Sequence, residues 1–262
     1  MVQPLALVSA LRFVAAEDLL YAGASAQDID QAVADGLMFR FKLQRRLTSE
    51  TPTDVLAMTR KGAVSLSQAF SADPDSVPSD TRSSCHRSAM FLDHSLARSR
   101  FAVLLVRALE QGVPASVLSW EQDPERLADT VHITTGSEGL GRLPLVADGL
   151  AVAAGPRGPE GLLVEIDRGT ERPSYLGRKY RGYLEWWKND GPKRRFDLPA
   201  LRILTVAPDA KRVARLVEAC QKATEGRANG LYWFADENDL SAHGILAPVW
   251  RTMNAEHLQL WS

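Results

Sequence analysis

The stretch LLVEIDRGTE, residues 162–171, places two carboxylates inside an otherwise apolar segment. Alternate residues of a β-strand face the same side, so Glu165 and Asp167 share one face while the apolar residues occupy the other. Burying an unpaired carboxylate is costly. The two acids therefore need a proton, a cationic side chain or a metal ion beside them.

A third acid lies in the preceding segment, RLPLVADGLAVAAG, which predicts a strand over 142–155 joined by the turn GPRGPE to a strand over 160–167. If that turn closes near residues 157 and 158, Asp148 lies opposite Asp167 and on the same face as Glu165. Three such carboxylates repel one another unless a cation compensates. A hard divalent ion, Mg²⁺ or Mn²⁺, suits this all-oxygen set.

Ion pairs are the alternative explanation for the same acids. Arg168, Arg172 and Arg178 are close in sequence, and a slip of one residue in the strand register would pair Asp148 with Arg168. Acids at strand ends that face basic helices commonly form salt bridges. The spacing alone leaves both the metal site and the ion pairs open.

Basic residues are concentrated near these acids, although the formal net charge of the chain is only −1. Nine basic and three acidic residues lie between Arg168 and Arg195. Such a cluster either holds DNA phosphates or forms a solvated helix face. The candidate DNA contacts in this region are Arg168, Arg172, Arg178, Arg181 and Lys188, with the KRR run at 193–195.

The elements that position these residues follow residues 71–88, a segment rich in Ser, Pro and Asp that predicts a linker. Beyond it, apolar periodicity predicts the order α, β, β, β, α, β, α, β over 91–112, 115–120, 142–155, 160–167, 174–188, 201–207, 209–223 and 231–235. This order implies a mixed sheet flanked by helices, within a domain over 89–262. Tyr180 and Tyr183 have the helical spacing of a core stripe.

Residues 1–70 predict three short helices, over 5–13, 15–23 and 25–36, followed by a β-hairpin, which is the order of a winged helix. The candidate DNA contacts of this domain are Lys42, Arg45 and Arg46 in the wing, with Arg60 and Lys61 after it. The third helix carries three aspartates, which disfavour phosphate. Protein contact or homodimerisation through this domain is therefore an equally supported alternative.

The composition bounds the class of protein. The 262 residues contain only two cysteines, Cys85 and Cys220, whose spacing indicates neither a disulfide framework nor a zinc site. Free thiols fit a reducing compartment, and from the residues at hand we expect neither a secretory leader nor a membrane-spanning run. We expect a cytoplasmic protein without a membrane partner.

Four motifs carry a family resemblance: VEIDRGTE at 164–171, KYRGY at 179–183, DHSLARSRFAVLLVRAL at 93–109 and APVWR at 247–251. Together they resemble the replication-relaxation family of plasmid and mobile-element proteins. That family is related to plasmid relaxases whose catalytic domain looks like a restriction endonuclease behind a winged helix. The resemblance implies an α+β, mixed α/β protein with an N-terminal winged helix and a restriction-endonuclease-like αβββαβ core.

Nucleases of that fold use a PD-(D/E)xK pattern, in which two acids bind Mg²⁺ and a lysine activates or orients water. The resemblance makes Asp148 the first acid and Glu165 the second, with Asp167 where the lysine should stand and as a third metal ligand. Lys179, on the following helix, is the implied replacement for that lysine. The proline before the first acid is missing, because the chain reads LVAD.

The implied activity is metal-assisted cleavage of a DNA phosphodiester, as in a nickase or relaxase acting in replication or transfer. Two other hypotheses stay open. The first is a non-catalytic DNA-binding regulator built on an inactivated nuclease-like domain. The second is a protein-interaction adaptor that assembles through the acidic third helix.

Overall fold

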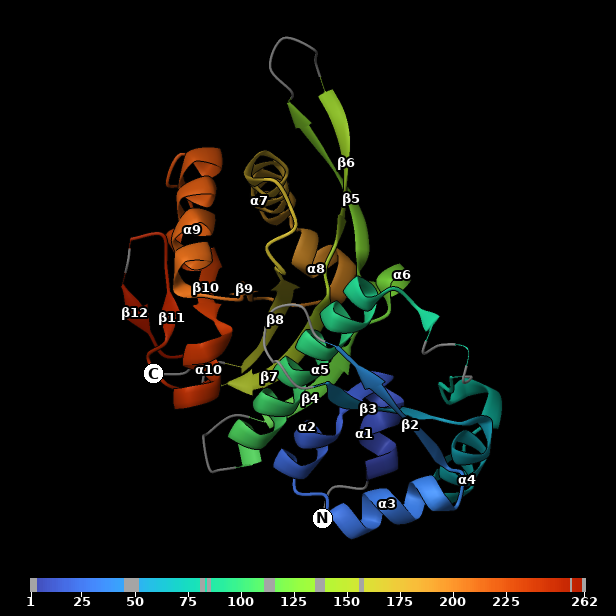
Figure 1. The fold of residues 1–262 in the computed structure, drawn as a ribbon. Coiled ribbons are helices and arrows are strands. Elements are labelled where there is room, and N and C mark those ends of the chain that lie inside the picture. Colours follow the sequence, from blue (N-terminus) through green and yellow to red (C-terminus); the bar gives the residue numbers. More distant parts are fainter. Residues whose placement is uncertain are drawn as a thin grey trace. The chain divides into compact units, whose positions relative to one another are not determined.

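The computed structural model describes residues 4–44, 52–80, 83, 86–110, 116–134, 140–155, 158–254 and 256–260. The chain is a mixed α+β protein that divides into two compact units, Met1–Arg107 and Ala108–Ser262 (Figure 1). No helix in the described part of the chain has both the length and the apolar composition that crossing a membrane requires.

The first unit contains the three helices that the sequence predicted, α1 (Pro4–Leu11), α2 (Ala16–Tyr21) and α3 (Ala26–Ala34). The hydroxyl of Ser25 caps α3 by accepting a hydrogen bond from the Asp28 amide at 3.0 Å. The predicted hairpin is β2 (Met38–Leu43) and β3 (Thr53–Met58). A short strand that the sequence did not predict, β1 (Phe13–Ala15), completes a sheet of order β1-β3-β2.

Beyond the hairpin, the described residues of this unit form helical segments that include α4 (Arg60–Phe70), the 3₁₀ turn η1 (Pro74–Ser76) and α5 (Ala89–Glu110). Leu92 and Leu96 of α5 are buried in the core that contains Phe13. The Ser99 hydroxyl donates to the Phe13 carbonyl at 2.7 Å. The unit boundary therefore differs from the predicted one, because most of α5, assigned from the sequence to the domain over 89–262, packs on the first unit.

The second unit is built on a seven-stranded sheet of order β12-β11-β10-β9-β8-β7-β4. Strand β7 is antiparallel to both β4 and β8, whereas β8, β9 and β10 are parallel. The strands are β4 (Ser116–Glu121), β7 (Gly149–Gly155), β8 (Gly158–Ile166), β9 (Leu201–Ala207), β10 (Tyr232–Asp236), β11 (Trp250–Arg251) and β12 (His257–Leu258).

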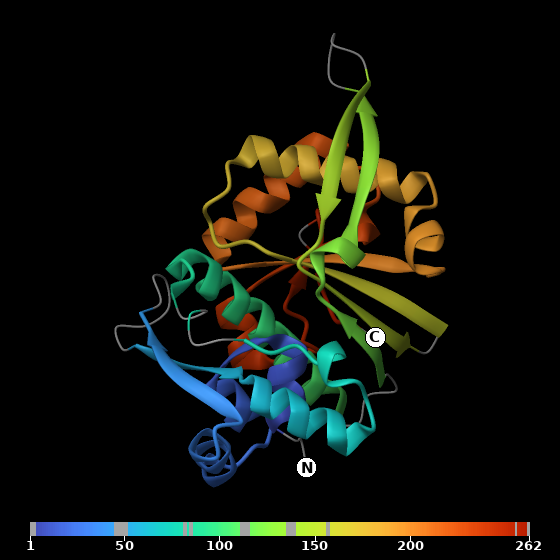
Figure 2. The same cartoon turned by 90° about the vertical axis from the view of Figure 1, so that its right-hand side faces the viewer.

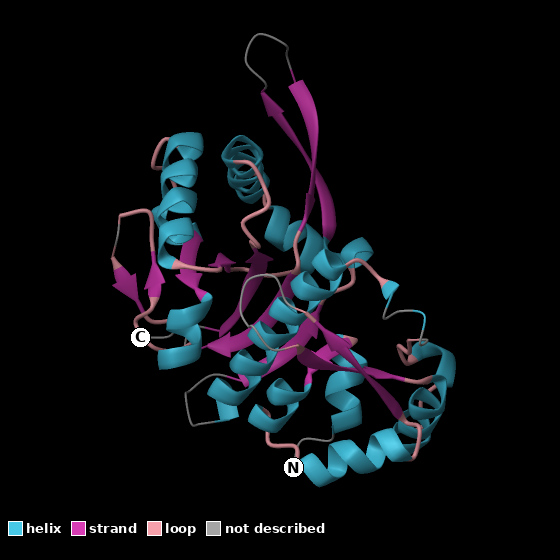
Figure 3. Cartoon of the chain, in the orientation of Figure 1, coloured by secondary structure: helices cyan, strands magenta, loops and turns pink. Residues whose placement is uncertain are grey.

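Helices α7 (Pro173–Lys188) and α9 (Ala210–Thr224) connect the parallel strands and lie side by side on one face of this sheet (Figure 3). Tyr180 and Tyr183 of α7 are buried in the core, as their spacing predicted. Leu216 and Cys220 of α9 join the same cluster. The C-terminal part of the unit also contains the 3₁₀ turn η4 (Asn229–Leu231) and α10 (Glu237–His243).

The segment predicted as one strand over 142–155 is in fact broken. Strand β6 (Leu140–Val146) pairs with β5 (Ala128–Thr134) in a separate ribbon, which projects away from the main sheet (Figure 2). Strand β7 begins three residues after β6 ends, with Asp148 in the connection. The apolar alternation continues through this connection, so the sequence pattern did not reveal the break.

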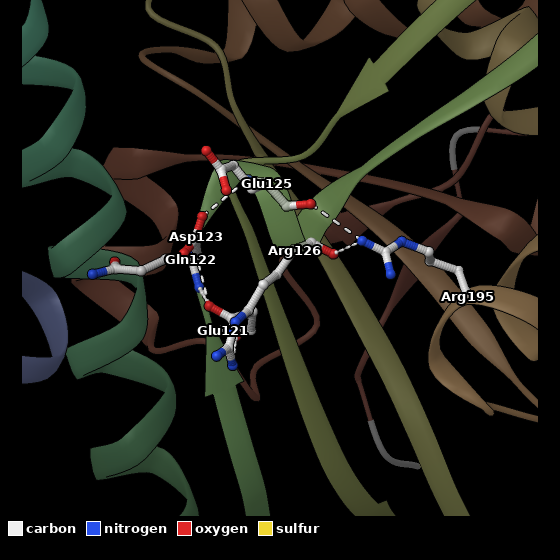
Figure 4. A network of polar contacts seen from close by, with 6 residues as sticks. All are labelled: Glu121, Gln122, Asp123, Glu125, Arg126 and Arg195. Atoms are coloured by element: carbon white, nitrogen blue, oxygen red, sulfur yellow. Dashed lines mark hydrogen bonds and ion pairs between the residues drawn. The ribbon is translucent and has the colours of Figure 1, made fainter. Parts of the chain in front are cut away.

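A polar network fixes the base of the ribbon (Figure 4). Arg195, in α8 (Gly191–Phe196), donates to the carbonyls of Arg126 at 2.8 Å and of Glu125 and Ala128 at 3.2 Å. Those carbonyls belong to α6 (Pro124–Leu127) and to the first residue of β5. Arg195, predicted within a phosphate-binding run, therefore holds α8 against the ribbon.

Candidate functional site

The three predicted acids lie near the carboxyl end of β8, but in a register that differs from the prediction. Gly149 pairs with Val164 and Gly155 with Gly158, so Asp148, the residue before Gly149, lies beside Glu165 and not opposite Asp167. The centre of the hairpin lies one residue earlier than predicted, which moves every partner by two residues. A two-residue shift leaves each side chain on its predicted face.

Asp148 closes the end of the β7–β8 pairing. Its backbone amide donates to the Val164 carbonyl at 3.0 Å, and its Oδ2 accepts from the Ile166 amide at 2.7 Å. Because β7 begins only at Gly149, the carboxylate supplies the partner that the strand would otherwise give to Ile166. This contact holds a partly exposed acid at the edge of the site.

Glu165 is buried and bonded through both carboxylate oxygens. Its Oε2 contacts the Lys179 ammonium, and its Oε1 accepts from the Tyr183 hydroxyl. Burial raises the pKa of Glu165, Lys179 counteracts this rise, and repulsion from Asp148 adds to it, with a net pKa of about 7. The acid is therefore poised between its charged and neutral forms near neutral pH.

Lys179 remains charged under the same conditions. Burial alone lowers the pKa of its ammonium, but attraction to Glu165 and then to Asp148 outweighs burial and raises the pKa above its ordinary value. The structure thus brings together three residues that the sequence proposed for catalysis: Asp148, Glu165 and Lys179.

Tyr183 completes this arrangement, and its contact with Glu165 was missed from the sequence. Lys179 and Tyr183 are four residues apart on α7, so their side chains project from the same face of the helix. That spacing was the available signal. Burial raises the pKa of the Tyr183 phenol well above its ordinary value, which makes it a neutral hydrogen-bond donor to Glu165 and not a nucleophile.

Asp167, the third predicted acid, is bound by an arginine. Arg212 of α9 donates to Asp167 through Nε at 2.5 Å and Nη2 at 2.9 Å, in the bidentate geometry that guanidinium and carboxylate favour. The same Nη2 reaches the Glu171 carbonyl at 3.0 Å. Arg212 was missed because it lies 45 residues along the chain from Asp167.

The described residues contain no group of three or more histidine, cysteine, aspartate or glutamate side chains arranged to hold a metal ion. With Asp167 paired to Arg212, the oxygen donors available in the site are those of Asp148 and Glu165. Mg²⁺ in proteins is commonly bound through one or two carboxylates, with water and substrate phosphate filling the remaining positions. The two acids fit that requirement.

The predicted DNA contacts fall into two groups. Arg168 is 6% exposed and forms an ion pair with Glu237. Its guanidinium is therefore not accessible to a DNA phosphate, contrary to the prediction. Arg172, Arg178, Arg181 and Lys188 are exposed at the start of α7 or along it.

In the first unit, Lys42 pairs with Asp54 at 2.9 Å, Lys61 donates to the Asp35 carbonyl at 2.7 Å and Arg60 pairs with Asp75. These three basic groups of the predicted wing region already have protein partners. Arg45 and Arg46 lie outside the described residues.

The second unit is thus an α+β structure in which two acids, Asp148 and Glu165, lie side by side where β7 and β8 meet. Helix α7 places Lys179 beside them. The model of the replication-relaxation family matches residues 19–198, and the chain belongs to that family. The matched region contains Asp148, Glu165 and Lys179 and ends before Arg212. No curated protein and no solved structure matches the chain. Membership indicates a role in the replication of a plasmid or mobile element.

Proposed function

We propose that the second unit is a metal-dependent DNA nickase or relaxase with a restriction-endonuclease-like core. The observation that carries this proposal is the placement of Asp148 beside Glu165 on neighbouring strands, with Lys179 in contact with Glu165. The strand arrangement supports it, because β4, β7, β8 and β9 follow one another in space in chain order, and the helices α7 and α8 connect the parallel pair β8 and β9.

In the proposed mechanism, Asp148 and Glu165 would hold a Mg²⁺ or Mn²⁺ ion, which would supply polarisation of a phosphate and a lowered pKa of water. Lys179 stabilises negative charge that develops on the phosphate, because its ammonium is charged and positioned before substrate arrives. Tyr183 orients the Glu165 carboxylate through its hydroxyl. Asp167 and Arg212 fix the segment between β8 and α7 and take no part in the reaction.

The first unit supports DNA association in this proposal as a winged helix, with α3 as its third helix and β2–β3 as its wing. Asp28, Asp30 and Asp35 make α3 or its C-terminal end acidic. Contact with DNA is therefore assigned to the wing, whereas α3 is assigned to a protein partner or a second copy of the chain.

A second candidate is a non-catalytic DNA-binding regulator on the same scaffold. One observation favours it: both oxygens of Glu165 already have protein partners, and Asp167 is neutralised by Arg212. A carboxylate has about four lone-pair positions, so these contacts leave room for a metal ion but do not require one.

Nicking of supercoiled plasmid in Mg²⁺ or Mn²⁺ separates the two candidates. The proposed enzyme converts supercoiled to open-circular plasmid, and Asp148→Asn and Glu165→Gln each reduce the rate by at least a hundredfold. Asp197→Asn is the matched control, because this aspartate is exposed just after the end of α8 and, within the described structure, pairs with Lys193. A folded wild-type protein that leaves the plasmid intact with both metals selects the regulator.

A further inference from the structure

A groove runs along the outer surface of the α7–α9 pair, with a volume of about 640 Å³. Its walls carry four basic side chains, Arg178 and Arg181 from α7 and Arg215 and Lys222 from α9. The two arginines of α7 were predicted DNA contacts, whereas the two residues of α9 were not. The basic surface of the second unit therefore extends onto a helix outside the predicted cluster.

Small residues at the contact between the helices explain the groove. A Cβ atom built on Gly177 would lie 3.5 Å from the Ala223 Cβ and 3.8 Å from the Ala219 carbonyl oxygen, so little space separates the two backbones there. Gly177, Ala219 and Ala223 have almost no side chain, so they form the floor of the groove. The long basic side chains on each helix rise above them and form its walls.

The charges in the groove are available to a ligand. Within the described structure, Arg178, Arg181, Arg215 and Lys222 form no ion pair or hydrogen bond, and all four are exposed. Of the two acids in the lining, Glu225 is paired with Arg227 at 3.2 Å, which leaves Glu218 as the opposing charge. By contrast, Arg168, Arg195 and Arg212 have protein partners.

We propose that the α7–α9 groove binds the phosphate backbone of duplex DNA without reading its sequence. Arginine and lysine are the side chains that hold phosphate oxygens, and the resulting binding is independent of base sequence. The described lining contains no aromatic side chain on which unpaired bases could stack, which favours the duplex over a single strand. The groove's affinity for phosphate is argued from its own residues. Only the choice of DNA as the polyanion rests on the proposed function.

The spacing of the basic residues fits a run of phosphates. Arg215 and Lys222 are two helical turns apart, or about 10 Å along α9. This span is short enough for both side chains to contact nearby phosphates of one DNA strand. The groove therefore holds a short length of backbone and adds a contact surface to the unit that carries the proposed active site.

Fluorescence anisotropy with a labelled duplex of about 20 base pairs, in EDTA and across a series of salt concentrations, tests the proposal. We expect Arg215→Gln/Lys222→Gln to raise Kd about tenfold or more and to reduce the slope of log K against log salt by about 2. Glu218→Gln should lower Kd, because it removes the opposing carboxylate while leaving the helix intact. This opposite sign separates a phosphate site from a loss of folding.

Arg142→Gln/Lys211→Gln is the control, because it removes two positive charges from exposed residues of the same unit that do not line the groove. It should change Kd and the salt slope less than the groove variant does. An unchanged Kd in the groove variant, or equal effects of the two double variants, would overturn the proposal. Binding of the single strand at least as tight as that of the duplex would also contradict it.

The metal-free assay keeps this proposal separate from the proposed nuclease activity. Binding is measured in EDTA, so the groove variant is judged on Kd alone and no cleavage contributes to the result. A protein that binds through the groove but does not nick DNA would refute the enzyme and support the groove. If the wild type nicks DNA and the groove variant binds with the wild-type Kd, the enzyme is supported and the groove is refuted.

Discussion

The Lys179 ammonium of α7 contacts the Glu165 carboxylate of β8, although 14 residues separate them in the chain. The side chains are 18% and 10% exposed respectively, so the ion pair is largely removed from water. Such a pair stabilises little compared with apolar packing, but loss of one partner leaves a buried charge. Removal of either partner alone should therefore destabilise the protein more than the intact pair stabilises it.

The titration of Glu165 predicts a specific pH dependence of stability. The folded-state pKa of about 7 exceeds the ordinary value of 4.5, so the folded protein binds this proton more readily than the unfolded chain does. The stabilisation is complete below about pH 4.5 and is lost as the pH rises through 7. We expect the free energy of unfolding of the wild type to fall by about 3 kcal/mol relative to Glu165→Gln over this window.

Urea denaturation of both proteins between pH 4 and 8 measures this difference. The comparison with Glu165→Gln cancels the contributions of the other titrating groups, since they are present in both chains. Curves that remain parallel over the whole range would show that Glu165 titrates near its ordinary pKa.

Gly62 provides a test of close packing in the first unit. A Cβ atom at this position of α4 would lie 2.1 Å from the Leu37 carbonyl oxygen and 2.8 Å from the Met58 Cγ. Because the nearest atom belongs to the backbone, Gly62→Ala should destabilise the protein by about 1 to 3 kcal/mol, even though alanine favours helix. Thermal denaturation followed by circular dichroism measures the change.

The control is Gly177→Ala in α7, where the nearest atom to the new Cβ is at an ordinary contact distance of 3.5 Å. Alanine there should leave stability unchanged or raise it by up to about 1 kcal/mol, through helix propensity alone. If both glycine substitutions have the same effect, the close approach of Leu37 to α4 is not as the structure describes.

Local patterns predicted the elements of the site better than they predicted its contacts. The apolar run before Glu165 predicted β8, and the helical spacing around Lys179 predicted α7, because both signals lie within one element. Asp148 lies beside Glu165 in the structure, yet its strand was predicted without the break, since the alternation of apolar residues continues across Ala147.

The ion pairs of the site could not be predicted in the same way. Arg212 and Glu237 lie 45 and 69 residues from their partners Asp167 and Arg168, on helices whose placement depends on the order of the parallel strands. Nothing in the local sequence distinguishes a carboxylate that meets an arginine from one that meets a metal ion. Of the two alternatives raised by the sequence, ion pairs account for contacts of Asp167 and Glu165, whereas metal binding by Asp148 and Glu165 stays a prediction.

The Asp167–Arg212 pair predicts strong energetic coupling. Asp167 is 3% exposed and Arg212 is 11% exposed at the side chain, so removal of either partner leaves a poorly solvated charge. Each of Asp167→Asn and Arg212→Gln should destabilise the protein by about 3 kcal/mol, and the double variant by clearly less than the sum. A double-mutant cycle from urea denaturation, with a coupling energy near zero as the contradicting result, tests this.

Addition of Mg²⁺ separates the roles of the three acids without any activity measurement. An ion that binds only the folded protein raises its free energy of unfolding, by about 1.4 kcal/mol at a concentration ten times Kd. We expect this stabilisation in the wild type and in Asp167→Asn, and its loss in Asp148→Asn and Glu165→Gln. It should be larger at pH 8 than at pH 6, because the ion competes with the proton that Glu165 binds with a pKa of about 7.

If Asp167→Asn also abolished the stabilisation by Mg²⁺, Asp167 would be a ligand of the ion. The ion would then displace Arg212, and the Asp167–Arg212 pair would belong only to the metal-free state. An effect retained in Asp148→Asn would place the ion elsewhere in the protein and remove the basis of the proposed cleavage.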